Sequence, residues 1–229
     1  MGTLAAGIGH ELNNITTAYL GLLDEVREQA ATGRPPSPDT LANLEQIGRH
    51  YRMHGTHMLG IGRPGLDQPM RLDPCDVTRD TLSMLGTVGK TKRLDVRTDF
   101  SVASSFVFAD RRRIEQVLVN FVSNASDATA GNADGQRRLT VTVGRGADGF
   151  VFCDIEDNGC GIPEQDLDTI FDPYFTTKVP GQGTGLGLSV VKQIVESCRG
   201  KVTVRSRVAV GTVFTFALPA SPDETGPVD

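Results

Sequence analysis

The first thirty residues carry an apolar seam that a lone helix cannot bury. Its members follow one another at steps of four, three, four, three and four residues: Ile8, Leu12, Ile15, Tyr19, Leu22 and Val26. Steps of three and four place all of these side chains on one stripe of an α-helix. The pattern therefore predicts a long helix over residues 3–30 whose seam packs against another helix.

A second seam follows a proline-rich break at residues 33–38. A new helix is expected to start between Ser37 and Asp39, with Pro38 in its first turn. Its seam positions are Leu44, Ile47, Tyr51, His54, Met58 and Ile61. Two such helices form a hairpin whose apolar stripe stays uncovered, so we expect a homodimer in which two hairpins build a four-helix bundle.

The pattern changes after a linker at residues 63–69. Beyond it, helical and strand-like stretches are mixed, which indicates an α+β architecture. We expect helices at residues 76–88, 110–130 and 187–198, and strands at 94–100, 105–108, 139–143, 150–155, 201–206 and 212–218. The expected organisation is a helical hairpin in residues 1–66 followed by an α/β two-layer sandwich in residues 67–229.

The composition excludes several classes of protein. A net charge of -5 gives no bulk attraction for nucleic acid or for an anionic membrane. The chain contains no run of about eighteen apolar residues, so no transmembrane helix is expected, and the N-terminus lacks the pattern of a signal peptide. Four scattered cysteines without a CxxC pair are typical of reduced thiols, so we expect a cytoplasmic protein.

Three blocks in the second region carry candidate chemistry. The first lies on the expected helix at 110–130, where Asn120, Asn124 and Asp127 are spaced by four and three residues and share one face. A neutral amide oxygen on this face can join a Mg²⁺ shell whose other ligands are phosphate oxygens and water. A solvated helix face would show the same spacing.

The second block is the turn after the strand at 150–155. Asp157 is followed by Gly159, Gly161 and Ile162. A carboxylate in this place can accept the exocyclic amine of adenine, and two glycines let the backbone approach the ring. A simple Asp-Asn-Gly turn between two elements is the alternative.

The third block is a glycine-rich loop that runs into the helix expected at 187–198. Alternating glycines leave backbone N–H groups free to face phosphate, and a helix N-terminus follows directly. A flexible linker is the alternative. The residues concerned are Gly183, Thr184, Gly185, Leu186, Gly187 and Leu188. Residues 86–91 look like the end of another phosphate loop, but Met84 stands where glycine is needed, so they receive no role.

His10 is the candidate nucleophile. It lies two positions from both Ile8 and Leu12, so it is expected to face away from the seam, with Glu11 beside it. A neutral imidazole has one free nitrogen lone pair, and an adjacent carboxylate can hold the other nitrogen as N–H. Three further histidines share a face of the second helix: His50, His54 and His57. No acid or cysteine completes a metal site there, so a packed or solvated face is the better interpretation.

These blocks occur in one order, with residues 171–178, Phe-Asp-Pro-Tyr-Phe-Thr-Thr-Lys, between the second and the third. With His-Glu-Leu-Asn-Asn at residues 10–14 in front, the chain resembles the sensor histidine kinases of two-component systems over residues 3–219, in particular the nitrogen-regulation and hybrid-kinase subgroup. The resemblance implies the Bergerat (GHKL) ATP-binding fold. It also implies autophosphorylation of a histidine by ATP and transfer of the phosphoryl group to an aspartate in a response-regulator receiver domain.

The resemblance implies roles for single residues. His10 resembles the phosphoacceptor, Glu11 the acid that orients its ring and takes its proton, and Asn14 the residue that positions water for phosphatase activity. Asn124 resembles the Mg²⁺ ligand and Asp157 the adenine-binding acid. The resemblance implies further residues that contact ATP, with Lys178 at the γ-phosphate. They are Asn120, Asp127, Gly159, Gly161, Ile162, Phe175, Lys178, Gly183, Thr184, Gly185, Leu186, Gly187 and Leu188.

Two other classes of protein stay open. One is a binding module, either a histidine phosphotransferase or a degenerate kinase that no longer uses ATP; Asn124, Asp157 and the glycine loop argue against it. The other is an ATPase or a serine/threonine kinase of the same fold. Hydrolytic relatives carry a glutamate base where Asn120 stands, and an amide cannot deprotonate water, so wasteful hydrolysis is expected to be suppressed.

The chain departs from the family pattern at three places. Ile15 stands where many members have proline. Residues 198–200, Cys-Arg-Gly, replace a frequent His-Gly-Gly and place Arg199 at its centre. Ala209 replaces a frequent glycine. The last two lie at helix and strand ends and away from the expected ATP contacts, so activity is not put in doubt.

Overall fold

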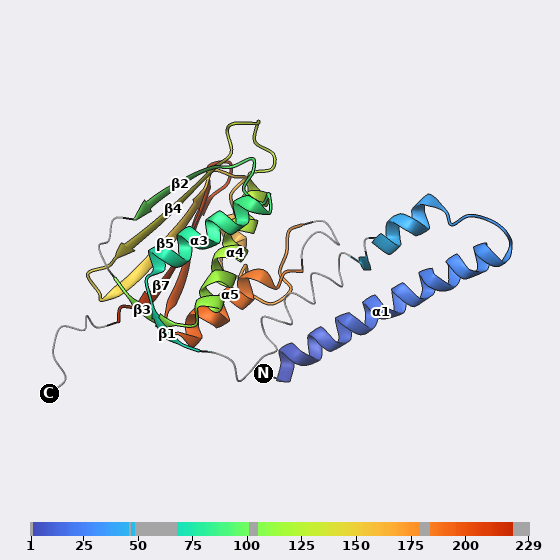
Figure 1. Cartoon of the computed structure of the whole chain (residues 1–229), viewed down its shortest axis with the longest axis horizontal. Coiled ribbons are helices and arrows are strands. Elements are labelled where there is room, and N and C mark those ends of the chain that lie inside the picture. The colour runs from blue at the N-terminus through green and yellow to red at the C-terminus, as the bar shows by residue number, and fades with distance from the viewer. Residues whose placement is uncertain (1, 46, 49–67, 101–104, 179–183, 222–229) are drawn as a thin grey trace. The chain divides into compact units, whose positions relative to one another are not determined.

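The computed structural model describes residues 2–45, 47–48, 68–100, 105–178 and 184–221, with side chains described from Thr16 onward in the first helix (Figure 1). The chain divides into two compact units. One comprises residues 1–63 and 173–186, and the other comprises residues 64–172 and 187–229.

The first unit contains the first helix of the predicted hairpin and the start of the second. Helix α1 (Gly2–Ala31) confirms the long helix, and Gly33 ends it with a left-handed φ of 72°. The next helical segment starts at residue 38, as expected, because the Ser37 hydroxyl accepts the N–H of Thr40 at 3.0 Å. The buried Thr40 hydroxyl in turn donates to Glu25 of α1 at 2.9 Å, which fastens the two helices beside the turn.

Part of the second seam cannot be compared with the structure. Seam positions from Tyr51 to Ile61, and the three histidines of that helix, lie outside the described residues.

The second unit is a two-layer α/β sandwich, as predicted. Its sheet has five strands in the order β2-β4-β5-β7-β6. In that order their bounds are Asp95–Phe100, Arg138–Arg145, Phe150–Asp157, Gly211–Pro219 and Lys201–Arg207. β2 is parallel to β4 and the other neighbours are antiparallel. Helices α3 (Pro74–Thr87), α4 (Arg111–Ala128) and α5 (Gly187–Ser197) cover one face of the sheet (Figure 1).

The core lies between this sheet and its helices. Alternate residues of β4, β5 and β7 are buried and meet the apolar face of α4, since a strand shows every second side chain to one side. Phe121 of α4 stacks on Phe214 of β7 with ring centroids 4.9 Å apart. Burying each such side chain contributes roughly 1.5–3 kcal/mol, so this contact sets where α4 lies on the sheet.

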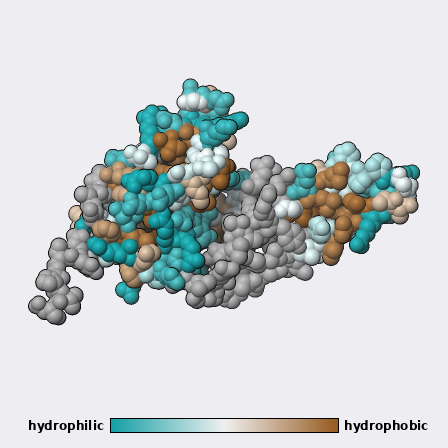
Figure 2. All heavy atoms as spheres, viewed as in Figure 1, coloured by the Kyte–Doolittle hydropathy of each residue, from teal (hydrophilic) through white to brown (hydrophobic). Residues whose placement is uncertain are grey.

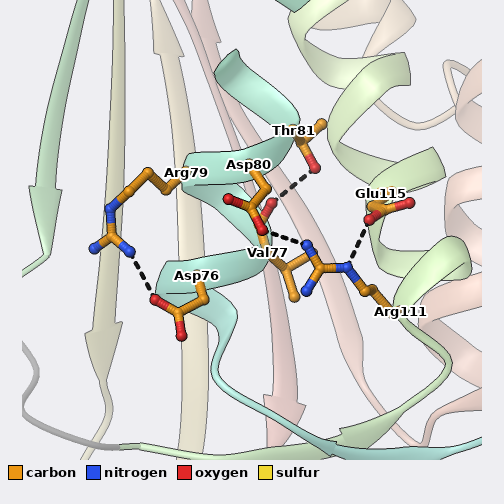
Figure 3. Close-up of polar contacts among 7 residues, drawn as sticks. All are labelled: Asp76, Val77, Arg79, Asp80, Thr81, Arg111 and Glu115. Atoms are coloured by element: carbon orange, nitrogen blue, oxygen red, sulfur yellow. Dashed lines mark hydrogen bonds and ion pairs between the residues drawn. The ribbon is translucent and has the colours of Figure 1, made fainter. Parts of the chain in front are cut away.

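Charged side chains join α3 to α4 on the outside of this layer (Figure 3). Arg111 binds Asp80 of α3 at 2.6 Å and Glu115 one turn along its own helix at 2.8 Å. Asp76 and Arg79 form a pair within α3 at 2.6 Å. These groups are partly or largely exposed, so each pair contributes no more than about 1 kcal/mol.

One strand was missed directly after the expected linker. β1 (Met70–Leu72) pairs antiparallel with β3 (Val107–Ala109) in a separate two-stranded sheet. Three residues are too few to show a period of two. The pairing is supported from outside the strand, because the Asp110 carboxylate that caps α4 also accepts the N–H of Gln68 at 2.9 Å.

The glycine stretch at 86–91 ends α3. Gly89 adopts a left-handed φ of 78°, its N–H donates to Gly86 at 3.1 Å, and the N–H of Lys90 donates to Leu85 at 2.9 Å. This is the Schellman arrangement of a helix C-terminus. The stretch thus satisfies helix carbonyls and is not needed for phosphate.

Within the described ranges, none of the helices has both the length and the apolar character needed to cross a membrane.

Candidate functional site

Helix α4 forms one wall of the candidate site. Asn120 and Asn124 are half-buried on it and Asp127 is exposed. The Nδ2 of Asn120 is buried and has no hydrogen-bond partner among the residues that the structure describes. An unpaired buried amide costs about 1–3 kcal/mol. A phosphate oxygen or an ion-bound water would remove that cost, so this wall fits a phosphorylated ligand.

The N-terminus of α5 lies directly beside this amide. A Cβ built on Gly187, the first residue of α5, would lie 3.5 Å from Oδ1 of Asn120. The first N–H groups of a helix lack partners within the helix and carry a partial positive charge. The first turn of α5, which Gly187 and Leu188 open, thus begins beside Asn120, and the role of these two residues toward phosphate stays a prediction.

Asp157 ends β5 and is 5% exposed. Its Oδ1 accepts the N–H of Gly159 at 2.8 Å. Burial raises the pKa of Asp157 from 3.8 to about 6, and backbone hydrogen bonds from Gly159 and Thr212 act against that rise. The carboxylate is thus mostly ionised at neutral pH, and it is a buried hydrogen-bond acceptor.

The loop after Asp157 is clasped on both sides by the protein's own backbone. A Cβ on Gly159 would come within 2.6 Å of the carbonyl carbon of Ala128, at the end of α4. Gly161 has a φ of 72°, and a Cβ there would overlap the carbonyl oxygen of Arg207. Both glycines thus have a packing reason in addition to the predicted approach of a ring.

Asn158 holds the same loop to the start of β4. Its Oδ1 accepts the N–H of Arg138 at 2.8 Å and its Nδ2 donates to Gln136 at 2.8 Å. The amide of Asn132 donates to the Asn158 carbonyl oxygen at 2.9 Å. These three hydrogen bonds tie the loop to the segment between α4 and β4.

The glycine loop is described from Thr184 onward, so Gly183 lies outside the described residues. Gly185 has a φ of 65° and accepts the N–H of Tyr174 at 3.0 Å, and the N–H of Leu186 contacts the Thr184 hydroxyl at 3.3 Å. Residues 173–178 and 184–186 thus form one folded segment of the first unit.

Five predicted site residues can be placed only by segment. His10, Glu11 and Asn14 lie in α1, as expected, and their side chains are outside the described part of the structure. Phe175 and Lys178 are both half-buried, in the segment that carries Tyr174. Their roles stay predictions.

Two residues of the site escaped the sequence analysis. Thr212 is the register partner of Asp157 and is 3% exposed, and Ser206 is the partner of Thr212 on β6. The Ser206 hydroxyl accepts the N–H of Ile162 at 2.8 Å, which ties the loop to the β6–β7 hairpin. A signal existed: both are polar at strand positions whose same-face neighbours, such as Val204 and Phe214, are apolar.

Comparisons with known proteins agree with this geometry. Residues 109–222 match the family of histidine kinase-, DNA gyrase B- and HSP90-like ATPases. AtoS, a signal transduction histidine-protein kinase of Escherichia coli strain K12, is 31% identical over 226 residues, which cover 97% of this chain and 35% of AtoS. The solved catalytic domain of the histidine kinase ThkA is 31% identical, with a TM-score of 0.57, over 66% of this chain and 95% of that domain. The structure of ThkA in complex with the response regulator TrrA matches with a TM-score of 0.72 at 25% identity, over 98% of this chain and 63% of that one.

The fold and the walls around Asn120 and Asp157 thus define an ATP-binding domain of the GHKL type in residues 109–222. With its relatives taken into account, the chain belongs to the sensor histidine kinases. It spans about a third of the length of AtoS. The subgroup within the family stays a prediction. In the described ranges, no group of three or more His, Cys, Asp and Glu side chains is placed to hold a metal ion.

Proposed function

We propose that this chain phosphorylates His10 with ATP and passes the phosphoryl group to an aspartate of a response-regulator receiver domain. The observation that carries the proposal is the unpaired buried amide of Asn120 beside the N-terminus of α5, in the same unit as the buried carboxylate of Asp157. These groups match the two ends of ATP, since one side offers donors to phosphate and the other an acceptor to the adenine amine.

The chemistry at His10 is a phosphoryl transfer. The neutral ring attacks the γ-phosphorus through Nε2, a nitrogen–phosphorus bond forms, the bond to the β–γ bridging oxygen breaks, and ADP leaves. Glu11 holds the Nδ1–H and takes that proton as the ring becomes positive. Asn14, one turn after His10, positions a water molecule for a second activity, which is dephosphorylation of the response regulator.

The asparagines of α4 bind ATP, the phosphoryl donor, at its phosphates. Asn124 would hold Mg²⁺, which supplies charge neutralisation to the phosphates when it is bound. The amide of Asn120 lines the same wall and cannot act as a base toward water. The phosphoryl group is therefore kept for histidine, which favours a kinase over an ATPase of this fold. ATP as donor also places the reaction in the cytoplasm.

The hairpin supplies the proposed homodimer. Leu20 and Leu41 are 52% and 48% exposed, and Figure 2 shows an apolar surface along the described part of the hairpin. The seam residues Leu22 and Val26 are only half-buried in a single chain. A second hairpin would cover this surface, which supports residues 1–66 as the dimerisation and phosphotransfer domain and residues 67–229 as the catalytic domain.

Label uptake tests the function. The full chain is incubated with γ-labelled ATP and Mg²⁺, alongside His10→Gln and the matched variant His50→Gln. The unsubstituted chain and H50Q are expected to take up an acid-labile label, whereas H10Q takes up none and still binds nucleotide. Labelling of H10Q would refute the acceptor assignment, and an acid-stable label would indicate a serine/threonine kinase. The relative ThkA was solved with a response regulator, so a receiver domain added to the labelled chain is the next step.

A further inference from the structure

The five-stranded sheet ends in two open edges that carry opposite charges. β2 is the strand at one edge (Figure 1) and β6 is the strand at the other, and within the described residues no further strand pairs with either. On an edge strand, every second residue turns its N–H and C=O away from the sheet, where another strand can bind them. Both edges thus present a row of backbone donors and acceptors to a partner.

The β6 edge is cationic. Lys201, Thr203 and Arg205 alternate along β6 and are exposed. The residues between them pair with Phe214 and Phe216 of β7, which are buried under the helices. Lys201, Thr203 and Arg205 therefore lie on the face of the sheet opposite the helices. Two cations stand four residues apart on that face, with an uncharged side chain between them.

The β2 edge has the complementary order of charges. Asp95, Arg97 and Asp99 alternate along β2 and are exposed. Val96 pairs with the buried Leu139 of β4, so the three charged residues also lie on the face opposite the helices. Two carboxylates thus stand four residues apart, with Arg97 between them and bound to Asp95 at 2.8 Å.

The directions of the two edge strands suit each other. β2 is parallel to β4, and three antiparallel steps lead from β4 to β6, so β2 and β6 run in opposite directions. When a second copy continues the sheet with its helices on the same side, its β2 meets β6 as an antiparallel neighbour. Antiparallel pairing is the more stable arrangement per residue.

One register brings all the opposite charges together. Its cross-edge pairs are Arg205 with Asp95, Thr203 with Arg97, Lys201 with Asp99, and Val204 with Val96. A shift of two residues in either direction sets Arg97 against Arg205 or against Lys201, and like charges directly opposite each other destabilise a pair. A shift of one residue turns the charged side chains of one strand toward the helix layer. The charges thus specify a single register between the two edges.

We propose that the β6 edge of one chain binds the β2 edge of a second copy and extends the sheet from molecule to molecule. This inference goes beyond the proposed function, since it involves neither ATP nor His10, and it is separate from the hairpin homodimer. The contact joins two different surfaces, so it is head-to-tail and leaves a free edge at each end for a further copy. A strand of six residues makes a small contact, which is typical of weak and reversible association. Hairpin dimers would gather into larger assemblies through it.

Sedimentation velocity of the full chain at rising protein concentration tests this contact. In low salt the mean mass is expected to rise with concentration without levelling at that of a dimer, and the rise should shrink in 1 M salt, where charges are screened beyond about 3 Å. Arg205→Glu sets two carboxylates against each other and Asp95→Lys sets two cations against each other, so each variant alone should associate about tenfold more weakly. Arg145→Glu makes the same change of charge on the inner strand β4 and should leave association unchanged.

A mixture of the two variants is the most direct measurement. The β6 edge of R205E meets the β2 edge of D95K with opposite charges facing each other again, while the β6 edge of D95K and the β2 edge of R205E are unsubstituted. Equal amounts of both variants are therefore expected to associate as strongly as the unsubstituted chain. The inference is overturned by an unsubstituted chain whose mass does not rise, by a rise that R205E leaves intact, or by a mixture that associates no better than its components. A mixture that recovers from monomeric components overturns only the hairpin homodimer.

Discussion

The backbone N–H of Ala209 donates to the carbonyl oxygen of Cys160 at 2.8 Å, so the β6–β7 turn holds the loop that follows Asp157. Ala209 makes this contact at a φ of 61°, in the left-handed region that favours glycine. Glycine suits this place, because the left-handed backbone costs about 1–2 kcal/mol for any residue with a Cβ.

Ala209→Gly should therefore stabilise the domain. The relieved backbone cost exceeds the extra chain entropy of glycine, so the free energy of unfolding should rise by about 0.5–1 kcal/mol. Urea unfolding of the two chains measures it. Ala217→Gly in β7 is the matched control, because a strand residue gains nothing from glycine, and it should destabilise. Destabilisation by A209G would show that the turn is not strained.

Arg199→Gly should act in the same direction at the end of α5. Arg199 has a φ of 57° and donates its N–H to Glu196 at 2.9 Å, while the N–H of Gly200 donates to Val195 at 2.9 Å. Arg199 thus occupies the left-handed position of a Schellman motif, where glycine is preferred. A gain of about 1 kcal/mol is expected. Arg199→Ala removes the same side chain and keeps the Cβ, so a gain of equal size in that variant would contradict the explanation.

Asp157→Asn should stabilise the domain at neutral pH and not in acid. Because burial raises the pKa of Asp157 to about 6, its contribution to folding is fully present below pH 3.8 and is lost as the pH rises through about 6. At pH 7.5 the buried charge costs about 2–3 kcal/mol relative to a neutral amide. Unfolding curves of both chains at pH 4 and pH 7.5 check this, and a difference that does not change with pH would refute it.

The same titration predicts the pH dependence of ligand binding. The ionised carboxylate is the better acceptor for an amino group, so affinity for ATP should rise from pH 5 to pH 7.5 with a midpoint near 6. D157N should bind at least about tenfold more weakly at pH 7.5. Calorimetric titration across this range is the measurement, and an unchanged midpoint in D157N would assign the effect to another group.

Asn120→Leu should separate stability from binding. Leucine has a similar volume and no amide, so the ligand-free domain should gain about 1 kcal/mol once the unpaired Nδ2 is removed. The increase in melting temperature on adding ATP and Mg²⁺ should shrink. Asn132→Leu is the matched control, since that amide donates to Asn158 at 2.9 Å and its removal should destabilise. A ligand-free N120L less stable than the parent chain would show that the amide is satisfied.

Local pattern sufficed for much of this molecule. The helical period of 3.6 residues predicts the stripe of α1 and the shared face of Asn120, Asn124 and Asp127 on α4. The strand period of two residues and the glycines that follow predict the turn after Asp157. Each of these patterns acts over only a few residues. These features can be predicted because the interactions that create them lie close together in the chain. The placement of His10 on a long helix follows from the same reasoning.

Tertiary structure decided which distant segments of the chain pair and pack together. The strand order β2-β4-β5-β7-β6, the short pairing of β1 with β3, and the meeting of Asp157 with Thr212 and Ser206 join residues tens of positions apart. Register between such strands is set by which faces pack against α4 and α5, and no local period records that choice. The sequence by itself thus determined most of the helices and strands and named the candidate residues for ATP, whereas packing decided the strand order and which hydroxyls lie beside Asp157.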